Sequence, residues 1–201
     1  MLKVTACIPC YNDERFLMDS VASLLAQTIP PYEILIIDDG SDEPIQQFLW
    51  NVPVIRVTHR GIGRCRNTGL MLAQGDLFLN LDADDTLDQN FIQECLKVFE
   101  APGKWDAVCV SMQELGLRND FYPAILPELE EERVHNSIPG CGMFRTQMLR
   151  EIGGWAEWWT GWDDWGLWLD LLTRKKRIYP ATKAIYNYQV RSDSITRGQT
   201  V

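Results

Sequence analysis

The sequence predicts an α/β fold, a single domain whose mostly parallel central sheet carries helices on both faces. Two observations support this prediction. Short apolar runs of strand length alternate with amphipathic helical stretches through the first half of the chain, and a polar cluster follows each of the first four predicted strands. Repeated strand–helix–strand units form parallel sheets, and the carboxyl ends of parallel strands meet at one edge. We therefore expect the four polar clusters to line one crevice.

The elements of the first half follow from their apolar patterns. Strands are expected where apolar residues run without interruption, and helices where apolar residues recur every three or four positions. The first helix places Phe16, Leu17, Val21, Leu24 and Leu25 on one face. In chain order we expect strands at 3–9, 33–38, 52–58 and 76–82, with helices at 14–27, 44–50 and 62–75.

The second half is less regular. We expect a helix at 91–100, a strand at 105–112, a short helix in 146–155 closed by Gly153 and Gly154, and an amphipathic helix at 163–174. The stretch 118–142 carries three prolines and an acidic run, and it reads as a loop or mobile flap. No linker separates two independent units, so residues 1–201 are expected to form one domain.

The bulk composition fits one soluble globular domain, because 201 residues with 46% hydrophobic and 23% charged residues can bury a sizeable core. A net charge of −9 argues against nucleic-acid binding, which needs a basic face. The N-terminus lacks a signal-peptide profile, and no apolar run approaches the ~20 residues that span a bilayer. We expect a cytoplasmic protein; the basic run 174–177 leaves peripheral contact with the inner face of the cytoplasmic membrane open as an alternative.

The fourth predicted strand leads directly into three closely spaced carboxylates, Asp82, Asp84 and Asp85. In an extended chain Asp82 and Asp84 would point to the same side about 7 Å apart. Such carboxylates repel one another unless a cation or hydrogen-bond donors compensate. Mg²⁺ and Mn²⁺ favour oxygen ligands and take one or two carboxylates, with water and phosphate completing the shell. The alternative is that these residues cap the next helix.

The clusters after the second and third strands offer a different chemistry. Asp39 could accept hydrogen bonds from a base or ribose, or serve only the turn at Gly40. Arg66 and its neighbouring arginines could pair with the aspartates or with an incoming diphosphate, and both interpretations stay open. A dinucleotide fingerprint is not supported, because Arg66 stands where its third glycine should fall.

The stretch 154–170 is rich in tryptophan, with Trp155, Trp158, Trp159, Trp162, Trp165 and Trp168. We expect Trp168 and Leu169 in the core, whereas indoles at a cleft make platforms for flat or sugar-like ligands. Asp163 and Asp164 could cap the helix that they begin. A carboxylate beside several indoles also loses hydration and gains basicity, which is the profile of a general base.

Several spaced segments together resemble a family-2 glycosyltransferase of the GT-A fold, a Rossmann-like α/β/α domain with a DxD-type motif after the fourth strand. They are IPCYNDERFLMDSVASLLAQT, EILIIDDGS, RCRNTGL, GDLFLNLDADD, GMFRTQMLREIGGW and DDWGLWL, and they cover nearly the whole chain in the family's order. The resemblance implies inverting transfer of a sugar, with Mn²⁺ or Mg²⁺, from a nucleotide-diphosphate sugar to the hydroxyl of a carbohydrate or glycolipid acceptor. It implies a role in polysaccharide or glycoconjugate synthesis, with a UDP-sugar as the favoured donor.

The resemblance also assigns roles to residues. Residues 1–115 would bind the nucleotide sugar and residues 116–201 the acceptor. The expected nucleotide-binding residues are Pro9, Tyr11, Asp39, Arg66, Asp82 and Asp84, and the expected metal ligands are Asp84 and Asp85. Asp163, or failing it Asp164, would be the base that deprotonates the acceptor. Trp162, Trp165 and Arg191 are expected at the acceptor or phosphate.

Two departures from the family pattern affect these assignments. The acid pair is Asp-Asp where the family usually has Glu-Asp, so the identity of the base stays open. Arg191 stands where a histidine often helps to bind metal or phosphate; arginine cannot ligate a metal ion but can clamp a phosphate.

Two rival interpretations remain. LDADDT also fits the DxDxT signature of haloacid-dehalogenase-like phosphatases, although that motif normally follows the first strand of its domain. A non-catalytic carbohydrate-binding relative is the other.

Overall fold

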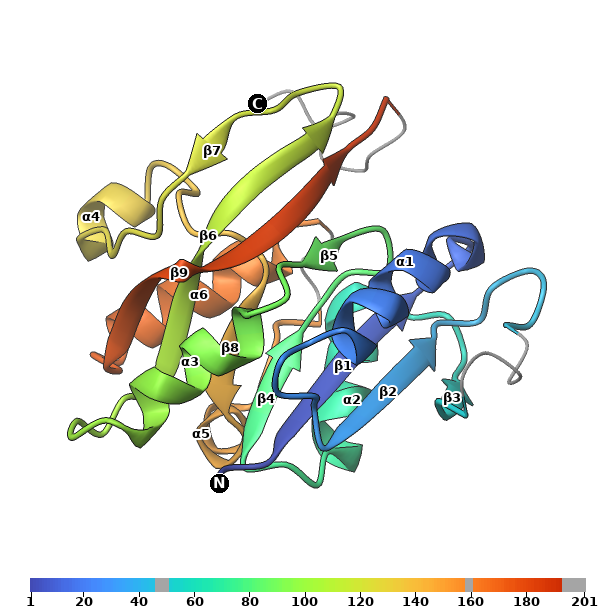
Figure 1. Ribbon diagram of the computed structural model, residues 1–201, viewed down its shortest axis with the longest axis horizontal. Coiled ribbons are helices and arrows are strands. Elements are labelled where there is room, and N and C mark those ends of the chain that lie inside the picture. The colour runs from blue at the N-terminus through green and yellow to red at the C-terminus, as the bar shows by residue number, and fades with distance from the viewer. Residues whose placement is uncertain (46–50, 158–160, 193–201) are drawn as a thin grey trace.

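The computed structural model describes residues 1–45, 51–157 and 161–192. Within these ranges one nine-stranded sheet runs in the order β3-β2-β1-β4-β8-β6-β9-β5, and β7 pairs with β6 outside this path (Figure 1). The strands are β1 Val4–Cys10, β2 Glu33–Asp38, β3 Val54–Arg56, β4 Leu77–Asn80, β5 Thr86–Leu87, β6 Ala107–Gly116, β7 Phe121–Tyr122, β8 Gly142–Arg145 and β9 Ile178–Val190. The helices are α1 Glu14–Leu25, α2 Ile62–Leu72, α3 Phe91–Glu100, α4 Leu129–Glu132, α5 Thr146–Ile152 and α6 Asp163–Thr173.

The α/β class is confirmed, and β3, β2, β1 and β4 pair in parallel as predicted. Beyond β4 the sheet becomes mixed, because β8 lies antiparallel between β4 and β6. β6 and β9 are again parallel, with a bulge between Val110 and Ser111. The sequence interpretation missed β5, β8 and β9, and its strand at 105–112 extends to Gly116. The predicted helix 44–50 falls largely on residues 46–50, which lie outside the described ranges.

Two apolar clusters cover the two faces of the sheet. Leu17, Val21 and Leu24 of α1 pack with Phe91 and Ile92 of α3 against one face. α2, α5 and α6 cover the other face, where Leu70, Leu149 and Trp168 are among the buried side chains. Alternate residues of β1 belong to opposite clusters, as the two-residue period of a strand requires.

Pro9 lies just beyond the point where the pairing between β1 and β4 ends. The Lys3 carbonyl accepts a hydrogen bond from the N–H of Leu77 in β4, and the Cys7 carbonyl accepts one from Leu81, the residue after β4. The backbone N–H and C=O groups of the odd-numbered residues of β1 therefore face β4. Pro9 is the next odd residue beyond Cys7, the last β1 residue with a partner in β4. Because proline has no N–H, no ladder donor is left unsatisfied there. The sheet therefore opens between the carboxyl ends of β1 and β4, the switch point where α/β sheets bind ligands.

The segment 118–142, predicted to be one loop or flap, contains β7 and α4 and is fixed to α6. The indole Nε1 of Trp165 donates to the carbonyl of Glu132 at 2.8 Å, and that of Trp168 donates to the carbonyl of Pro139 at 2.9 Å. The Glu132 side chain is buried and accepts a hydrogen bond from Ser137 Oγ at 2.5 Å. Most of the segment is a loop as predicted, but β7 and α4 interrupt it, and its hydrogen bonds to α6 anchor the part that was expected to be a loop or mobile flap.

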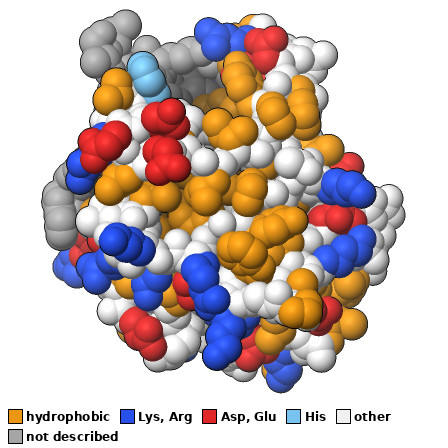
Figure 2. Space-filling model, turned by 90° about the vertical axis from the view of Figure 1, so that its left-hand side faces the viewer, with side chains coloured by type: hydrophobic (Ala, Val, Ile, Leu, Met, Phe, Trp, Pro, Cys, Tyr) orange, Lys and Arg blue, Asp and Glu red, His pale blue; other side chains and the backbone are white. Residues whose placement is uncertain are grey.

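One face of the molecule carries hydrophobic side chains across its middle, with Lys and Arg side chains mainly in its lower half (Figure 2). Large exposed apolar residues from the 118–142 segment are Phe121, Tyr122, Ile125, Leu126 and Val134. No helix in the described part of the chain is long and apolar enough to cross a bilayer.

Candidate active site

The loops after β1, β2 and β3 meet at the carboxyl edge around Asp39, whose side chain is buried. Its Oδ1 accepts the backbone N–H of Arg60 at 3.1 Å, and its Oδ2 accepts that of Gly61 at 2.9 Å. The His59 Nδ1 lies 3.0 Å from the same Oδ2 and 3.0 Å from the Asp39 carbonyl oxygen. The His59 ring stacks on Tyr11 with centroids 4.0 Å apart and planes 22° apart. Three of the predicted polar clusters therefore converge here.

The carboxylates after β4 do not alternate along a strand as expected. Residues 82–85 form a turn in which the N–H of Asp85 donates to the carbonyl of Asp82 at 3.2 Å. The three side chains consequently point to three different partners. None caps the next helix, since α3 begins after Asn90.

Asp82 points toward Arg66, which is 2% exposed and lies between two carboxylates. Its Nη2 is 2.6 Å from Asp82 Oδ1, and its Nη1 donates to Asp163 Oδ2. Burial alone would lower the pKa of Arg66, but Asp82 and Asp163 outweigh burial and raise it. Arg66 thus pairs with the aspartates, one of the two interpretations that the sequence left open.

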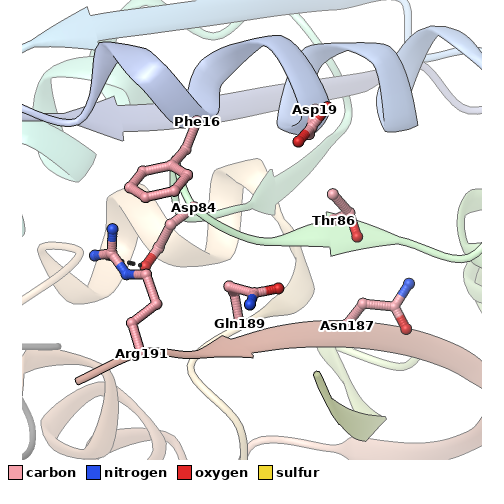
Figure 3. A pocket seen from close by; sticks show the side chains of 7 residues that line it. All are labelled: Phe16, Asp19, Asp84, Thr86, Asn187, Gln189 and Arg191. Atoms are coloured by element: carbon pink, nitrogen blue, oxygen red, sulfur yellow. Dashed lines mark ion pairs between the residues drawn. The ribbon is translucent and has the colours of Figure 1, made fainter. Parts of the chain in front are cut away.

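Asp84 points toward Arg191 at the end of β9. Arg191 Nη2 lies 3.0 Å from Asp84 Oδ2, its Nη1 lies 3.3 Å from Asp13 Oδ1, and its guanidinium sits 4.3 Å from the centre of the Phe16 ring. Asp84 also lines a cavity of about 280 Å³ with Arg191 and residues of α1, β5 and β9 (Figure 3). Burial and then Asp82 raise the pKa of Asp84 to about 6, while Arg191 opposes the shift.

Asp85 points away from this cavity into the protein. It is 1% exposed, and its carboxylate accepts hydrogen bonds from the Tyr186 hydroxyl and, at 2.7 Å, from the backbone N–H of Gln189. Burial, followed by Asp84 and Asp82, raises its pKa well above the usual value. Of the two expected metal ligands, only Asp84 thus faces the cavity.

The paired acids at the start of α6 have different environments. Asp163 is buried against Arg66. Asp164 is half-buried, lies against Gly140, and accepts the N–H of Trp165 at 2.8 Å. Burial raises the pKa of Asp164 to about 6; Arg66 opposes the shift and Asp163 adds to it. Asp164 is therefore the more accessible of the two carboxylates, and burial makes it more basic than an ordinary aspartate.

The tryptophans divide between core and surface of the site. Trp155 and Trp168 are buried, whereas Trp162 and Trp165 are half-buried neighbours with ring centroids 5.6 Å apart. Leu169 is only half-buried, because Leu167 and Leu171 form the core face of α6 instead. Trp158 and Trp159 lie outside the described residues.

The oxygen donors at the switch point fit a hard divalent cation, although no three His, Cys, Asp or Glu side chains of the described ranges form a metal cluster. Asp84 offers a carboxylate at the cavity, and Mg²⁺ or Mn²⁺ needs only one or two carboxylates when a diphosphate supplies further oxygens. A cation there would also offset the two effects that raise the pKa of Asp84, its burial and then its repulsion from Asp82.

Sequence reasoning missed two residues of the site, His59 and Tyr186. His59 directly follows the predicted third strand, 52–58, and begins a polar cluster at the carboxyl edge. That position could have indicated a site residue. Tyr186 lies in β9, a strand that the sequence interpretation did not place, so its contact with Asp85 had no signal.

Comparison with known proteins gives a family for this chain. The sequence model of glycosyl transferase family 2 matches residues 5–153, well over half of the chain. Chondroitin synthase of Escherichia coli is 35% identical over 103 residues, which are 48% of this chain and 15% of that protein. The chain spans 15%, 22% and 77% of the lengths of the first three curated relatives.

Two solved structures share the fold. Staphylococcus aureus TarS 1-349 in complex with UDP-GlcNAc has a TM-score of 0.76 at 22% identity, covering 100% of this chain and 62% of that one. The mannosyltransferase PcManGT from Pyrobaculum calidifontis, in complex with GDP-Man and Mn²⁺, has a TM-score of 0.73 at 16% identity, covering 98% and 59%. These likenesses agree with the predicted GT-A fold. The family match contradicts the phosphatase interpretation of the DxDxT stretch. This chain belongs to glycosyl transferase family 2.

Proposed function

We propose that the protein transfers a sugar, with inversion, from a nucleotide-diphosphate sugar to the hydroxyl of a carbohydrate or glycolipid acceptor in polysaccharide or glycoconjugate synthesis. One observation carries the proposal: the buried carboxylate of Asp39 near the Tyr11–His59 ring stack, the cavity-lining carboxylate of Asp84 and the basic carboxylate of Asp164 lie along one sheet edge. Residues 1–115 supply the first two and residues 116–201 supply the third.

The donor binds along the carboxyl ends of β1, β2 and β4. Tyr11 offers a ring face, Pro9 keeps the edge open, and the Asp39 carboxylate accepts an N–H from the base. A carboxylate acceptor suits uracil, whose Watson–Crick edge carries an N–H donor, and TarS is known in complex with UDP-GlcNAc. A UDP-sugar is therefore the favoured donor.

Asp84 is the residue that would hold Mn²⁺ or Mg²⁺, with Asp82 beside it. When bound, the ion would supply positive charge that stabilises the departing diphosphate. Arg191 already lies against Asp84, and its planar guanidinium can contact a phosphate oxygen from the same place. PcManGT, which is known in complex with Mn²⁺, supports a metal here.

Asp164 acts as the general base, and Asp163 anchors the helix through Arg66. Asp164 removes the proton of the acceptor hydroxyl as that oxygen attacks the anomeric carbon. The bond from that carbon to the diphosphate oxygen breaks on the opposite side, so the configuration inverts. Trp162 and Trp165 beside Asp164 offer indole surface to the acceptor. The 118–140 segment shields the reacting centre from water.

The test is release of UDP from UDP-sugars with Mn²⁺ and a saccharide acceptor. Asp164→Asn should reduce turnover by about 10²- to 10⁴-fold, as expected for a lost general base. Asp170→Asn is the matched control, because Asp170 lies on the exposed side of the same helix and pairs with Arg174. Tight nucleotide-sugar binding without turnover in the wild type would instead support a non-catalytic relative.

Exposed apolar and basic residues support peripheral contact with a membrane that carries a glycolipid acceptor. Exposed Phe121 and Ile125 supply apolar surface, and the basic run 174–177 supplies positive charge. Figure 2 shows that hydrophobic and basic side chains do occur together on one face of the molecule. Co-sedimentation with anionic lipid vesicles tests this, and replacing Lys175 and Lys176 by Glu should abolish it. Equal sedimentation of both proteins would count against the contact.

A further inference from the structure

The His59 side chain reproduces the two contacts expected of a nucleobase. Its aromatic ring lies on Tyr11 in a stacked arrangement, 4.0 Å between centroids and 22° between planes. Its Nδ1 lies 3.0 Å from the carboxylate of Asp39. A base that stacks on Tyr11 and donates an N–H to Asp39 would need the same ring face and the same oxygen. A centroid separation of 4.0 Å leaves no room for a second ring between Tyr11 and His59.

We propose that His59 is an internal stand-in for the nucleobase, and that the donor nucleotide binds only after displacing its imidazole ring. The proposal rests on the function proposed above, because it takes Tyr11 and Asp39 as the nucleoside contacts. It adds a residue that sets how tightly and how selectively a nucleotide binds. A ligand must offer both a stacking face and an N–H donor to replace what His59 already supplies.

The surroundings of His59 permit this exchange. The His59 side chain is 52% exposed, whereas that of Asp39 is 4% exposed, so the imidazole can leave toward solvent. Asp39 keeps its orientation when His59 leaves, because the N–H groups of Arg60 and Gly61 still hold its two oxygens. These amides belong to the backbone, so a His59 substitution leaves both of them in place. The pocket that remains has an open Tyr11 face and a fixed carboxylate.

The decisive measurement is the Kd of UDP with Mn²⁺, by titration calorimetry, for the wild type and His59→Ala. Removing the competitor should tighten UDP binding by about 3- to 10-fold, the equivalent of one partly exposed stacking contact and one hydrogen bond. His59→Phe keeps a ring on Tyr11 but lacks the N–H, and it should fall between the two. Thr58→Ala is the matched control, since Thr58 is an exposed neighbour of His59 and should bind UDP like the wild type.

The sign of the change separates this inference from its rivals. If His59 instead contacted the bound base, His59→Ala would weaken UDP binding. Weaker binding, or an unchanged Kd, would overturn the proposal. A crystal structure with UDP gives a second test: the base should lie on Tyr11 with His59 rotated away. If neither the wild type nor any variant binds a nucleotide, the proposed function itself fails. Binding by the wild type that weakens in Asp39→Asn but does not tighten in His59→Ala refutes only the stand-in role.

Discussion

Replacing Arg66 by Met should destabilise the fold far more than removing any exposed arginine. Arg66 is 2% exposed and pairs with Asp82 and Asp163 at once, so the substitution leaves two carboxylates without their counter-charge. Asp163 is itself buried, and water cannot take over the role of the guanidinium. Breaking a buried pair by removing one partner typically costs about 3–5 kcal/mol. In a chain of this size that corresponds to a fall in Tm of roughly 6–20 °C.

Urea denaturation followed by tryptophan fluorescence measures this effect. Arg64→Met is the control: Arg64 lies two residues away on α2, and its exposed ion pair with Glu157 at 3.7 Å should contribute about 0–1 kcal/mol. Adding Asp163→Asn to Arg66→Met should recover much of the loss, because it removes one of the stranded charges. A loss for Arg66→Met no larger than that of the control, or no recovery in the double variant, would refute the reasoning.

The pH dependence of the same variant has a definite sign. Without Arg66, the folded protein holds two carboxylates close together with no counter-charge, whereas unfolding exposes both to water. The destabilisation is then greatest where carboxylates are ionised, near pH 7, and shrinks as falling pH neutralises carboxylates. The stability gap between wild type and Arg66→Met should therefore be smaller at pH 5 than at pH 7. A gap that widens at pH 5 would contradict this charge-based account.

Three further outcomes are expected. The acid limb of kcat/KM should lie near pH 6, because Asp164 must be ionised to act as base and its pKa is raised to about 6; a limb near pH 4 in a pH-rate profile would exclude it. Tyr186→Phe should cost about 1–3 kcal/mol in urea denaturation, because it removes a hydrogen bond from buried Asp85, and a loss under about 0.5 kcal/mol would mean that this contact contributes little. Trp165→Phe should speed proteolysis within 118–140 by removing the donor to the Glu132 carbonyl, and an unchanged cleavage rate would argue against anchoring by this indole.

Elements that depend on local pattern were predictable from the sequence, and elements that depend on distant partners were not. β2 and α3 have the predicted bounds, since an uninterrupted apolar run and a strong helical period define them locally. β8 and the edge strand β5 are short, and their pairing with β4 and β9 is set by contacts far along the chain. β9 is long, but its buried residues are interspersed with partly and fully exposed ones, so it lacks the continuous apolar run of a buried strand.

The candidate site shows the same division. Its residues could be predicted because polar side chains after parallel strands must converge, and Asp39, Asp82 and Asp84 do lie at that edge. The direction of each carboxylate could not be predicted, because it depends on a turn at 82–85 and on Arg66, Arg191 and Tyr186 from other elements. The sequence pattern predicts which edge of the sheet a residue occupies, whereas the direction of its carboxylate depends on the residue that it contacts.

The missing amide hydrogen of Pro9 has a consequence for how faithfully this edge is kept open. The nitrogen that would continue the ladder toward β4 has no hydrogen to donate, and this is so at every temperature and pH and with or without a ligand. The ladder between β1 and β4 therefore ends at the same residue in the empty protein and in one that has just released its product.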